Sequence, residues 1–192
     1  MAKKSIESKY QKLTDTEHVL LRPSMYIGSV AIHTGDQYLY DGEKVTIEEV
    51  HYNPGFIKIF DEIVSNSVDE HRRNPKLNEI RVTINLDTNG IIVWDNGGIP
   101  VEKHPVHKEW IPEMIFGHLR TSTNYDENKK EKIVGGKNGF GFKLVLIWST
   151  YGQVETVDHV RGLKYVQEFK NNLNEICKPV ITKCKTKPYT KI

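Results

Sequence analysis

The chain has 192 residues, of which 38% are hydrophobic and 27% charged, as expected for one globular domain with a core of ordinary size. Its 27 Lys and Arg residues against 25 Asp and Glu residues leave a formal charge of +2, so overall charge does not indicate nucleic-acid binding. Five lysines near the C-terminal end fit a solvated tail more simply than a DNA-facing strip, and both interpretations stay open: Lys178, Lys183, Lys185, Lys187 and Lys191.

Cysteine content and hydropathy limit the class of protein further. Cys177 and Cys184 form no CxxC pair, which argues against a zinc site or a disulfide framework and fits a reducing compartment. The sequence has no apolar signal-like N-terminus and no run long enough to span a membrane. We therefore expect a cytoplasmic protein without a membrane partner.

The first 52 residues predict an arm followed by a hairpin. Residues 1–22 are mostly polar and predict an arm with one short helix, which Arg22-Pro23 would end. Residues 25–29 predict a short extended segment. Residues 33–52 predict a hairpin or a loop insertion, with a turn at Asp41-Gly42.

The strongest helix pattern covers residues 54–73. Asn53 supplies a capping side chain, Pro54 suits the first helical position, and Asn74-Pro75 would end the helix. Apolar residues recur at helical spacing and define a face for the core: Phe56, Ile59, Phe60, Ile63, Val64 and Val68.

The polar side of this helix carries a stripe of three residues. Glu62, Asn66 and Asp69 are spaced i, i+4 and i+7, so their side chains share one face. Such a stripe is usually only a solvated surface. Asn66, however, disfavours the middle of a helix, which would be compensated if it had a function. Both interpretations stay open at this point.

Alternating apolar residues next predict a strand over residues 79–86 and another over 91–94, joined by a turn. Asp95-Asn96-Gly97-Gly98-Ile99-Pro100 follows the second strand. A carboxylate beside two glycines at a strand end is either a plain turn or the acceptor for a ligand N–H group.

The most informative stretch is glycine-rich and runs from residue 135 to residue 143. Four glycines and two lysines, Lys137 and Lys143, stand immediately before an apolar run that predicts a helix over residues 143–149. Glycine allows positive φ, so backbone N–H groups can point toward an anion at the start of the helix. The pattern predicts a phosphate cradle, with a glycine-rich surface loop as the alternative.

Two common phosphate motifs are excluded for this stretch. Leu144 follows Lys143 where a P-loop has Ser or Thr. Residues 128–133 are mostly charged and cannot be the buried strand that precedes a dinucleotide fingerprint.

The remaining segments complete the predicted fold. A short helix is expected over residues 113–119, then a hydroxyl-rich loop and a charged lid-like segment. Near the end, residues 153–158 and 164–170 predict a hairpin, and residues 176–182 and 189–192 predict one or two last strands. Because βαβ spacing is absent, we expect an α+β fold: a two-layer sandwich with a mixed, mostly antiparallel sheet covered on one face by helices.

These motifs resemble a known family when taken in order. Residues 61–69, 95–100 and 135–143 resemble the motif set of the GHKL ATPases, and residues 10–14, 21–29 and 115–125 resemble the type II DNA topoisomerases within that superfamily. The resemblance implies the Bergerat (GHKL) ATPase fold, with an N-terminal arm at residues 1–30 and the ATPase domain at residues 31–192. Asn138 stands where gyrases typically have His, which is closer to eukaryotic and phage forms, and a large tailed bacteriophage is one source that fits.

The resemblance also implies a role for each motif. Glu62 would be the general base that polarises the attacking water, Asn66 would coordinate Mg²⁺, and Asp95 would accept a hydrogen bond from the adenine amino group. Sugar and phosphate contacts would come from Ser122, Thr123 and Asn124, from the backbone of Asn138, Gly139, Phe140 and Gly141, and from the charges of Lys137 and Lys143. Tyr10 matches an arm tyrosine that reaches the nucleotide of a second protomer. The implied cofactors are ATP and Mg²⁺; the implied partners are that protomer, double-stranded DNA through the full-length enzyme, and further topoisomerase subunits.

The chain departs from the family pattern at three points. The motif D-x-G-x-G is one residue short at Asp95-Asn96-Gly97-Gly98, and a gap-free register would place Trp94, which cannot accept a hydrogen bond, at the adenine position. Lys137 replaces the usual Arg, which keeps the charge but loses the bidentate geometry. The sequence stops at Ile192, before the transducer lysine and the DNA-cleavage parts of the family.

Two hypotheses follow from the resemblance. The first is the ATP-binding and ATP-hydrolysing domain of an ATP-dependent type II DNA topoisomerase, in which ATP-driven dimerisation gates DNA strand passage. The second is a nucleotide-binding and dimerisation fragment with weak ATP affinity and little turnover of its own.

Overall fold

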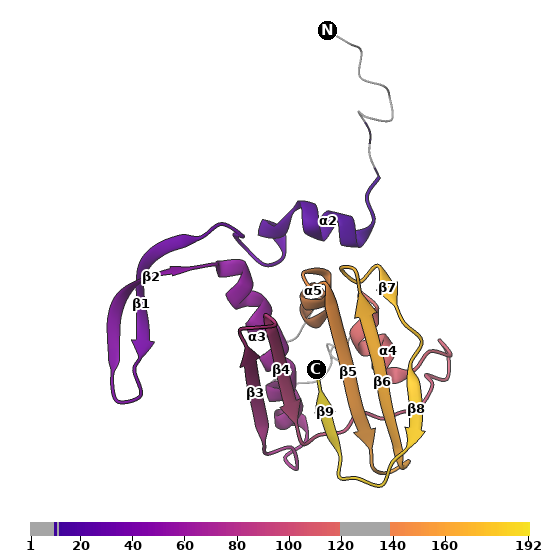
Figure 1. Ribbon diagram of the computed structural model, residues 1–192. Helices are drawn as coiled ribbons and strands as arrows, with labels where there is room; N and C mark the ends of the chain where they lie inside the picture. The colour runs from indigo at the N-terminus through magenta and orange to yellow at the C-terminus, as the bar shows by residue number, and fades with distance from the viewer. Residues whose placement is uncertain (1–9, 11, 120–138) are drawn as a thin grey trace, which may run out of the picture.

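The computed structural model describes residues 10, 12–119 and 139–192. Its helices are α2 (Asp15–Leu21), the 3₁₀ turn η1 (Pro23–Met25), α3 (Pro54–Arg73), α4 (Ile111–Gly117) and α5 (Gly141–Ile147). Its strands are β1 (His33–Tyr40), β2 (Val45–Tyr52), β3 (Ile80–Asn85), β4 (Gly90–Asp95), β5 (Tyr151–Asp158), β6 (Leu163–Lys170), β7 (Glu175–Ile176), β8 (Val180–Lys183) and β9 (Tyr189–Lys191). The strands from β3 to β9 form one sheet, with α3, α4 and α5 on the same side of it (Figure 1).

The last strand, β9, lies inside this sheet. The strand order is β3-β4-β9-β5-β6-β7, and β8 pairs with β6. Every pairing among the described strands is antiparallel. The prediction of a two-layer α+β fold with a mostly antiparallel sheet is confirmed, and the described sheet is more uniform than the mixed sheet we expected. Because β9 pairs with β4, Thr190 lies opposite Asp95.

Helix α3 forms with the bounds that its sequence predicts. The Asn53 side chain accepts a hydrogen bond from the backbone N–H of Phe56 at 3.0 Å, and Pro54 occupies the first helical turn. The backbone N–H of Asn74 donates to the Glu70 carbonyl at 2.7 Å and ends the helix. The buried residues of α3 include Ile63, Ser67 and Asp69, so the helix buries polar side chains as well as apolar ones.

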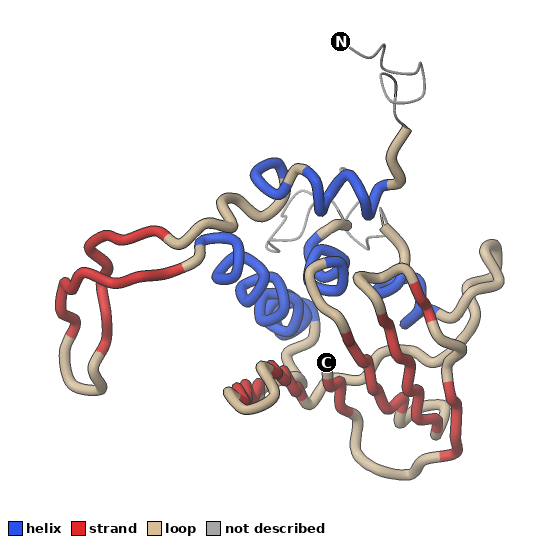
Figure 2. Tube along the Cα trace, turned by 45° about the horizontal axis from the view of Figure 1, so that its top comes forward, coloured by secondary structure: helices blue, strands red, loops and turns tan. Residues whose placement is uncertain are grey.

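The core lies between the sheet and the helices behind it. All residues of α5 from Phe142 to Ile147 are buried. Val19 and Ile27 belong to the same hydrophobic cluster, so these two positions of the arm pack onto the main domain, and α2 lies across the end of α5 (Figure 2). Other members come from α3, β4, α4 and β5: Ile63, Val93, Phe116 and Val154. Among the described residues, no helix combines the length and apolarity needed to cross a membrane.

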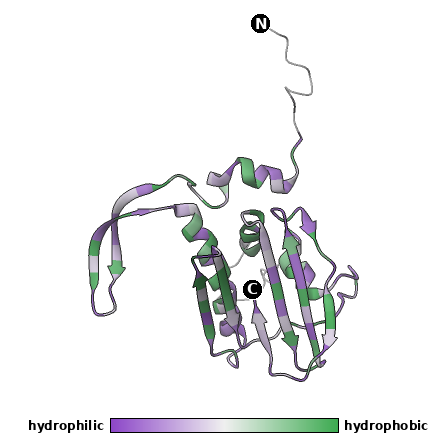
Figure 3. Cartoon of the chain, viewed as in Figure 1, coloured by the Kyte–Doolittle hydropathy of each residue, from purple (hydrophilic) through white to green (hydrophobic). Residues whose placement is uncertain are grey.

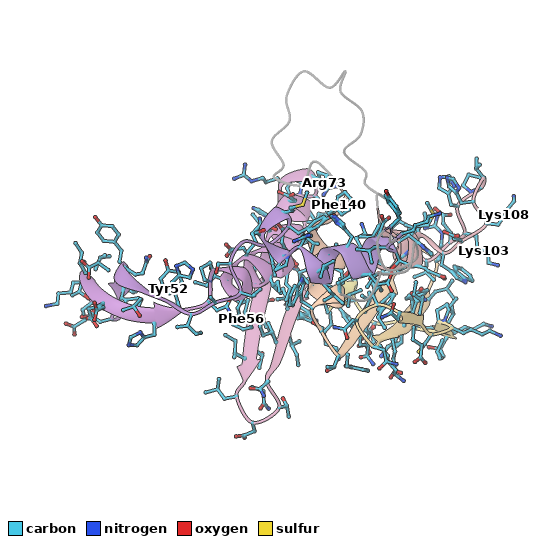
Figure 4. The ribbon with its side chains drawn as sticks, turned by 90° about the horizontal axis from the view of Figure 1, so that it is seen from above. Tyr52, Phe56, Arg73, Lys103, Lys108 and Phe140 are labelled. Atoms are coloured by element: carbon cyan, nitrogen blue, oxygen red, sulfur yellow. The ribbon has the colours of Figure 1, made fainter. Side chains whose placement is uncertain are left out.

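Strands β1 and β2 form the predicted hairpin, which projects from the body of the molecule (Figures 1 and 4). The Asp41 carboxylate accepts hydrogen bonds from the backbone N–H groups of Glu43 and Lys44 and closes the turn. Tyr52 and Phe56 mark the place where the hairpin passes into α3 (Figure 4). Figure 3 shows hydrophobic positions along the hairpin, and the side chains of Val45 and Ile47 among them are exposed. The rings of Tyr38 and Tyr40 are exposed as well.

Three local predictions need correction. Residues 25–29 do not form an extended segment, because the chain turns through η1 at Pro23–Met25 instead. Helix α4 begins two residues earlier than expected, with Pro112 in its first turn. Helix α5 likewise begins at Gly141 rather than at residue 143, so the last glycine of the glycine-rich stretch is already helical.

Candidate functional site

Glu62 lies on α3 and faces the start of α5. A Cβ atom added to Gly141 would overlap the Glu62 carboxylate oxygen Oε2, so a larger residue here would force the Glu62 side chain to move. The Glu62 side chain is 20% exposed. A carboxylate and the end of the glycine-rich stretch, which are far apart in the sequence, are therefore in contact.

Lys58 holds the other oxygen of the same carboxylate. Its Nζ atom lies 2.5 Å from Glu62 Oε1, one helical turn away. We did not identify Lys58 from the sequence, although its i, i+4 spacing to Glu62 is the signal that could have found it. The two Glu62 oxygens thus have different surroundings, a lysine on one side and a glycine backbone on the other.

Asn66 stands one turn beyond Glu62 on the same helix. Its Nδ2 atom donates to the backbone carbonyl of Glu62 at 2.7 Å, and the side chain is exposed. This bond uses the amide nitrogen, so the amide oxygen is the atom with which Asn66 could coordinate a cation. The described residues contain no group of three or more His, Cys, Asp or Glu that could hold a metal. Mg²⁺ does not need such a group, because it commonly keeps water and takes phosphate oxygens as ligands.

Asp95 ends β4 on the side of the sheet that faces α3, and it is only 6% exposed. Its Oδ2 atom accepts a hydrogen bond from Ser67 Oγ at 2.6 Å, and its Oδ1 atom accepts one from the Gly97 backbone N–H at 2.9 Å. Burial raises the pKa of Asp95, and the hydrogen bonds from Ser67 and Gly97 act against that rise. Sequence reasoning missed Ser67, which looks like a gap in the apolar face of α3.

The two alternative registers at this motif place different residues on different faces. Trp94 lies on the opposite side of the sheet from Asp95, since side chains alternate along a strand. There its ring stacks with that of Tyr189, with centroids 6.4 Å apart. Asp95 and not Trp94 therefore faces α3. The shortened turn is tightly packed, because a Cβ on Gly97 would come within 2.6 Å of Leu77 Cδ1.

The start of α5 carries the last residues of the glycine-rich stretch. Gly139 has a φ of +66°, which favours glycine. The Phe140 ring lies 6.3 Å from the Tyr26 ring, so the residues before α5 contact the arm. Lys143 is 4% exposed, and burial lowers its pKa to about 8.

The structure does not bring the remaining candidates into either of these two groups. Tyr10 is 71% exposed and precedes α2 in the chain. The five other candidates fall outside the described residues: Ser122, Thr123, Asn124, Lys137 and Asn138. Among the described candidates, the structure gathers Glu62, Asn66 and Asp95 around α3 and places Gly139, Phe140, Gly141 and Lys143 at the start of α5.

Comparison with known families identifies the class of protein. Residues 52–172 match the family described as histidine kinase-, DNA gyrase B-, and HSP90-like ATPase. This match covers more than half of the chain, so the chain belongs to that ATPase family. The resemblance drawn from the motifs is confirmed.

Within the family, the chain is similar to type II topoisomerases. It is 48% identical to DNA topoisomerase 2 from Pisum sativum, over 98% of this chain and 13% of the relative. It is 46% identical to DNA topoisomerase 2 from Acanthamoeba polyphaga mimivirus, over 98% of this chain and 15% of that relative.

Solved structures give the same result. The ATPase region of Saccharomyces cerevisiae topoisomerase II matches with a TM-score of 0.91 and 45% identity, over 95% of this chain and 49% of that one. The ATPase and transducer domains of DNA topoisomerase II from Balamuthia mandrillaris match with a TM-score of 0.93 and 44% identity, over 98% of this chain and 50% of the solved chain. The chain therefore spans a small part of the curated relatives and about half of these solved chains.

Proposed function

We propose that the chain binds ATP with Mg²⁺ and hydrolyses it as the ATPase domain of an ATP-dependent type II DNA topoisomerase. The observation that carries this proposal is the contact between Glu62 and Gly141, which places a carboxylate where the glycine-rich stretch runs into α5. Phosphoryl transfer needs a group that orients water beside groups that hold phosphate charge, and this junction offers both.

Each described residue then has a chemical task. Glu62 accepts hydrogen bonds from the attacking water and polarises it. Asn66 offers an amide oxygen to Mg²⁺, which would neutralise phosphate charge. Asp95 accepts a hydrogen bond from the adenine amino group at the other end of the site. Lys143 supports the phosphates with the backbone of Gly139, Phe140 and Gly141.

The rest of the proposal concerns residues outside the described part of the chain, the N-terminal arm and the partners of the intact enzyme. Ser122, Thr123, Asn124, Lys137 and Asn138 complete the contacts to sugar and phosphates. Residues 1–30 act as an arm whose Tyr10 reaches the nucleotide of a second protomer, and residues 31–192 form the ATPase domain. In the intact enzyme, ATP-driven dimerisation gates the passage of double-stranded DNA. The enzyme would act in the cytoplasm, or in that of the host if a phage encodes it.

Calorimetric titration with a non-hydrolysable ATP analogue, with and without Mg²⁺, tests the proposal. We expect binding that Mg²⁺ strengthens in the unsubstituted chain, and a loss of the Mg²⁺ effect in Asn66→Ala. Asn174→Ala is the matched control, because it also removes an amide that donates to a backbone carbonyl, that of Asn171 at 2.8 Å. Absence of binding at millimolar analogue would contradict the nucleotide assignment.

A further inference from the structure

We propose that a pocket between the β5–β6 turn and the loop from β8 to β9 is a second anion site, which binds phosphate groups. The pocket shares no residue with the site around α3 and α5, and its occupation does not depend on ATP hydrolysis. Its lysines lie outside every segment of the sequence that resembles the ATPase motifs.

The structure separates lysines that the sequence groups together. Strand β9 lies inside the sheet, so the C-terminal lysines are not on a solvated tail. Lys191 lies 3.7 Å from Glu155, which also pairs with Lys164 at 3.0 Å, so the charge of Lys191 is balanced within the sheet. Lys185 and Lys187, in the loop between β8 and β9, are exposed and form no ion pair with any residue that the structure describes.

Two turns form the walls of the pocket. They lie beside each other at the end of the sheet away from α2 (Figure 1). The backbone N–H of Cys184 donates to the carbonyl of Gly162 at 2.8 Å and ties the loop to the turn. The turn is held by Asp158, whose Oδ1 atom accepts hydrogen bonds from the backbone N–H groups of Val160 and Arg161, both at 3.1 Å. Because these bonds already fix both walls, a ligand would order little additional backbone.

The lining of the pocket supplies donors for an anion. The pocket has a volume of about 380 Å³, which lies within the range of small-ligand pockets. Ammonium groups, an imidazole and a hydroxyl line it, from Lys185, Lys187, His159 and Thr186. Among the described residues, those that line the pocket include no acidic side chain. Hydrogen bonds from charged donors such as these are stronger than those between neutral groups.

Cys184 gives a second indication that this pocket favours negative charge. Its Sγ atom, also in the lining, lies 3.0 Å from Thr186 Oγ1. Hydrogen bonds from Thr186 lower the pKa of the Cys184 thiol, and the charge of Lys164 lowers it further, while burial acts against both. Groups that stabilise a thiolate at this position would also stabilise the oxygens of a bound anion.

A phosphate group fits this donor set better than a carboxylate does. A terminal phosphate offers three acceptor oxygens and nearly two negative charges, whereas a carboxylate offers two oxygens and one charge. Two ammonium groups with a hydroxyl and an imidazole match the larger charge and the larger number of acceptors. Phosphate groups can reach such a pocket as a free compound, for example pyrophosphate, or as part of a DNA backbone.

Titration of the chain with inorganic pyrophosphate, followed by the backbone amide signals in NMR spectra, tests the site directly. We expect the signals of residues 184–187 to shift, and Lys185→Ala with Lys187→Ala to weaken this binding at least tenfold. Lys185→Arg with Lys187→Arg keeps both charges and should retain most of the affinity. The signals of residues 139–143 report the proposed nucleotide site separately, so a failure of one assignment is distinguishable from a failure of the other.

A second titration, with a short DNA duplex of mixed sequence, identifies the source of the phosphate. If the DNA backbone occupies the pocket, the Lys185→Ala and Lys187→Ala double variant should bind the duplex more weakly. The slope of log affinity against log salt concentration should then fall by about two, one for each lost phosphate contact. If duplex binding is unchanged in this variant while pyrophosphate binding is lost, the site takes free phosphate compounds.

The control removes the same charge elsewhere. Lys44→Ala with Lys76→Ala replaces two exposed lysines, one on the hairpin and one before β3, and should leave pyrophosphate binding unchanged. If this control weakens pyrophosphate binding as much as the pocket variant does, the anion responds only to overall charge and the proposal is wrong. The proposal is also wrong if neither millimolar pyrophosphate nor the duplex shifts the signals of residues 184–187.

Discussion

The two carboxylates beside α3 lie in contrasting environments. Glu62 is partly exposed, paired with the Lys58 ammonium group, and turned toward the start of α5. Asp95 is buried at the end of β4 and accepts hydrogen bonds from two neutral donors, Ser67 and the Gly97 backbone. The same functional group is therefore held by a charge in one region and by neutral hydrogen bonds in the other.

This difference indicates how the two regions divide their work. A carboxylate with access to solvent can exchange protons with water and act on it. A buried carboxylate with fixed donors keeps one orientation and is suited to reading a hydrogen-bonding edge of a ligand. Substitutions near Glu62 should therefore alter turnover more than binding, and substitutions near Asp95 should alter selectivity.

Glu62→Gln should have the largest effect. It preserves the shape of the side chain but removes the base, so we expect ATP turnover to fall about a thousandfold while analogue binding persists. Phosphate release and calorimetric titration measure the two quantities. Asp61→Asn, at the preceding exposed position on α3, is the control and should leave both unchanged. Turnover at the unsubstituted rate in Glu62→Gln would show that Glu62 is only a surface carboxylate.

Gly141→Ala should have the second-largest effect on ATP turnover. The new methyl group would overlap Glu62 Oε2 and force the carboxylate to move, and a displacement of about 1 Å can lower turnover about a hundredfold. Gly35→Ala is a suitable control, because beyond the adjacent residues no described atom lies within 4 Å of the Cβ that it would add. Equal turnover in the two variants would mean that the position of Glu62 does not matter for hydrolysis.

The sequence predicted those parts of the fold and the site that local patterns encode. Helix α3 has the predicted bounds because its cap and its first-turn proline, Asn53 and Pro54, are adjacent in sequence. The position of β9 between β4 and β5 could not be predicted, since it depends on pairing between residues such as Asp95 and Thr190. The hydrogen bond from Ser67 to Asp95 was missed for the same reason. It joins a helix to a strand end, and nothing in the local spacing connects them.

Lys143 allows a test of stability in the first of the two regions. Its folded pKa of about 8 lies below the model-compound value of 10.5, because burial disfavours the charged form. Below pH 8 the folded chain carries the buried charge and bears its full penalty. Between pH 8 and 10.5 the unfolded chain binds more protons than the folded one, so the contribution of Lys143 to stability rises with pH.

Lys143→Met should remove this contribution to the pH dependence of stability. We expect it to stabilise the nucleotide-free chain by about 2 kcal/mol at pH 7, with a smaller gain at pH 9.5, and to weaken analogue binding. Denaturant unfolding of both chains at the two pH values measures the difference. A gain that does not shrink as the pH rises would show that the Lys143 charge carries no folding penalty.

Lys58→Met should have the smallest effect and gives the most direct comparison of the two regions. Lys58 is 48% exposed, so its ion pair with Glu62 should contribute under about 1 kcal/mol to stability, and its loss should lower turnover only a few-fold by freeing Glu62 Oε1. Because salt screens an exposed ion pair, the difference between Lys58→Met and the unsubstituted chain should shrink between low salt and about 1 M salt. Lys58→Arg keeps the charge and should restore most of the activity. The effect of Asp95→Asn on analogue binding should change little with salt, since Asp95 is buried. If the effect of Asp95→Asn on binding depends on salt and the effect of Lys58→Met on turnover does not, the contrast drawn between the two carboxylates is wrong.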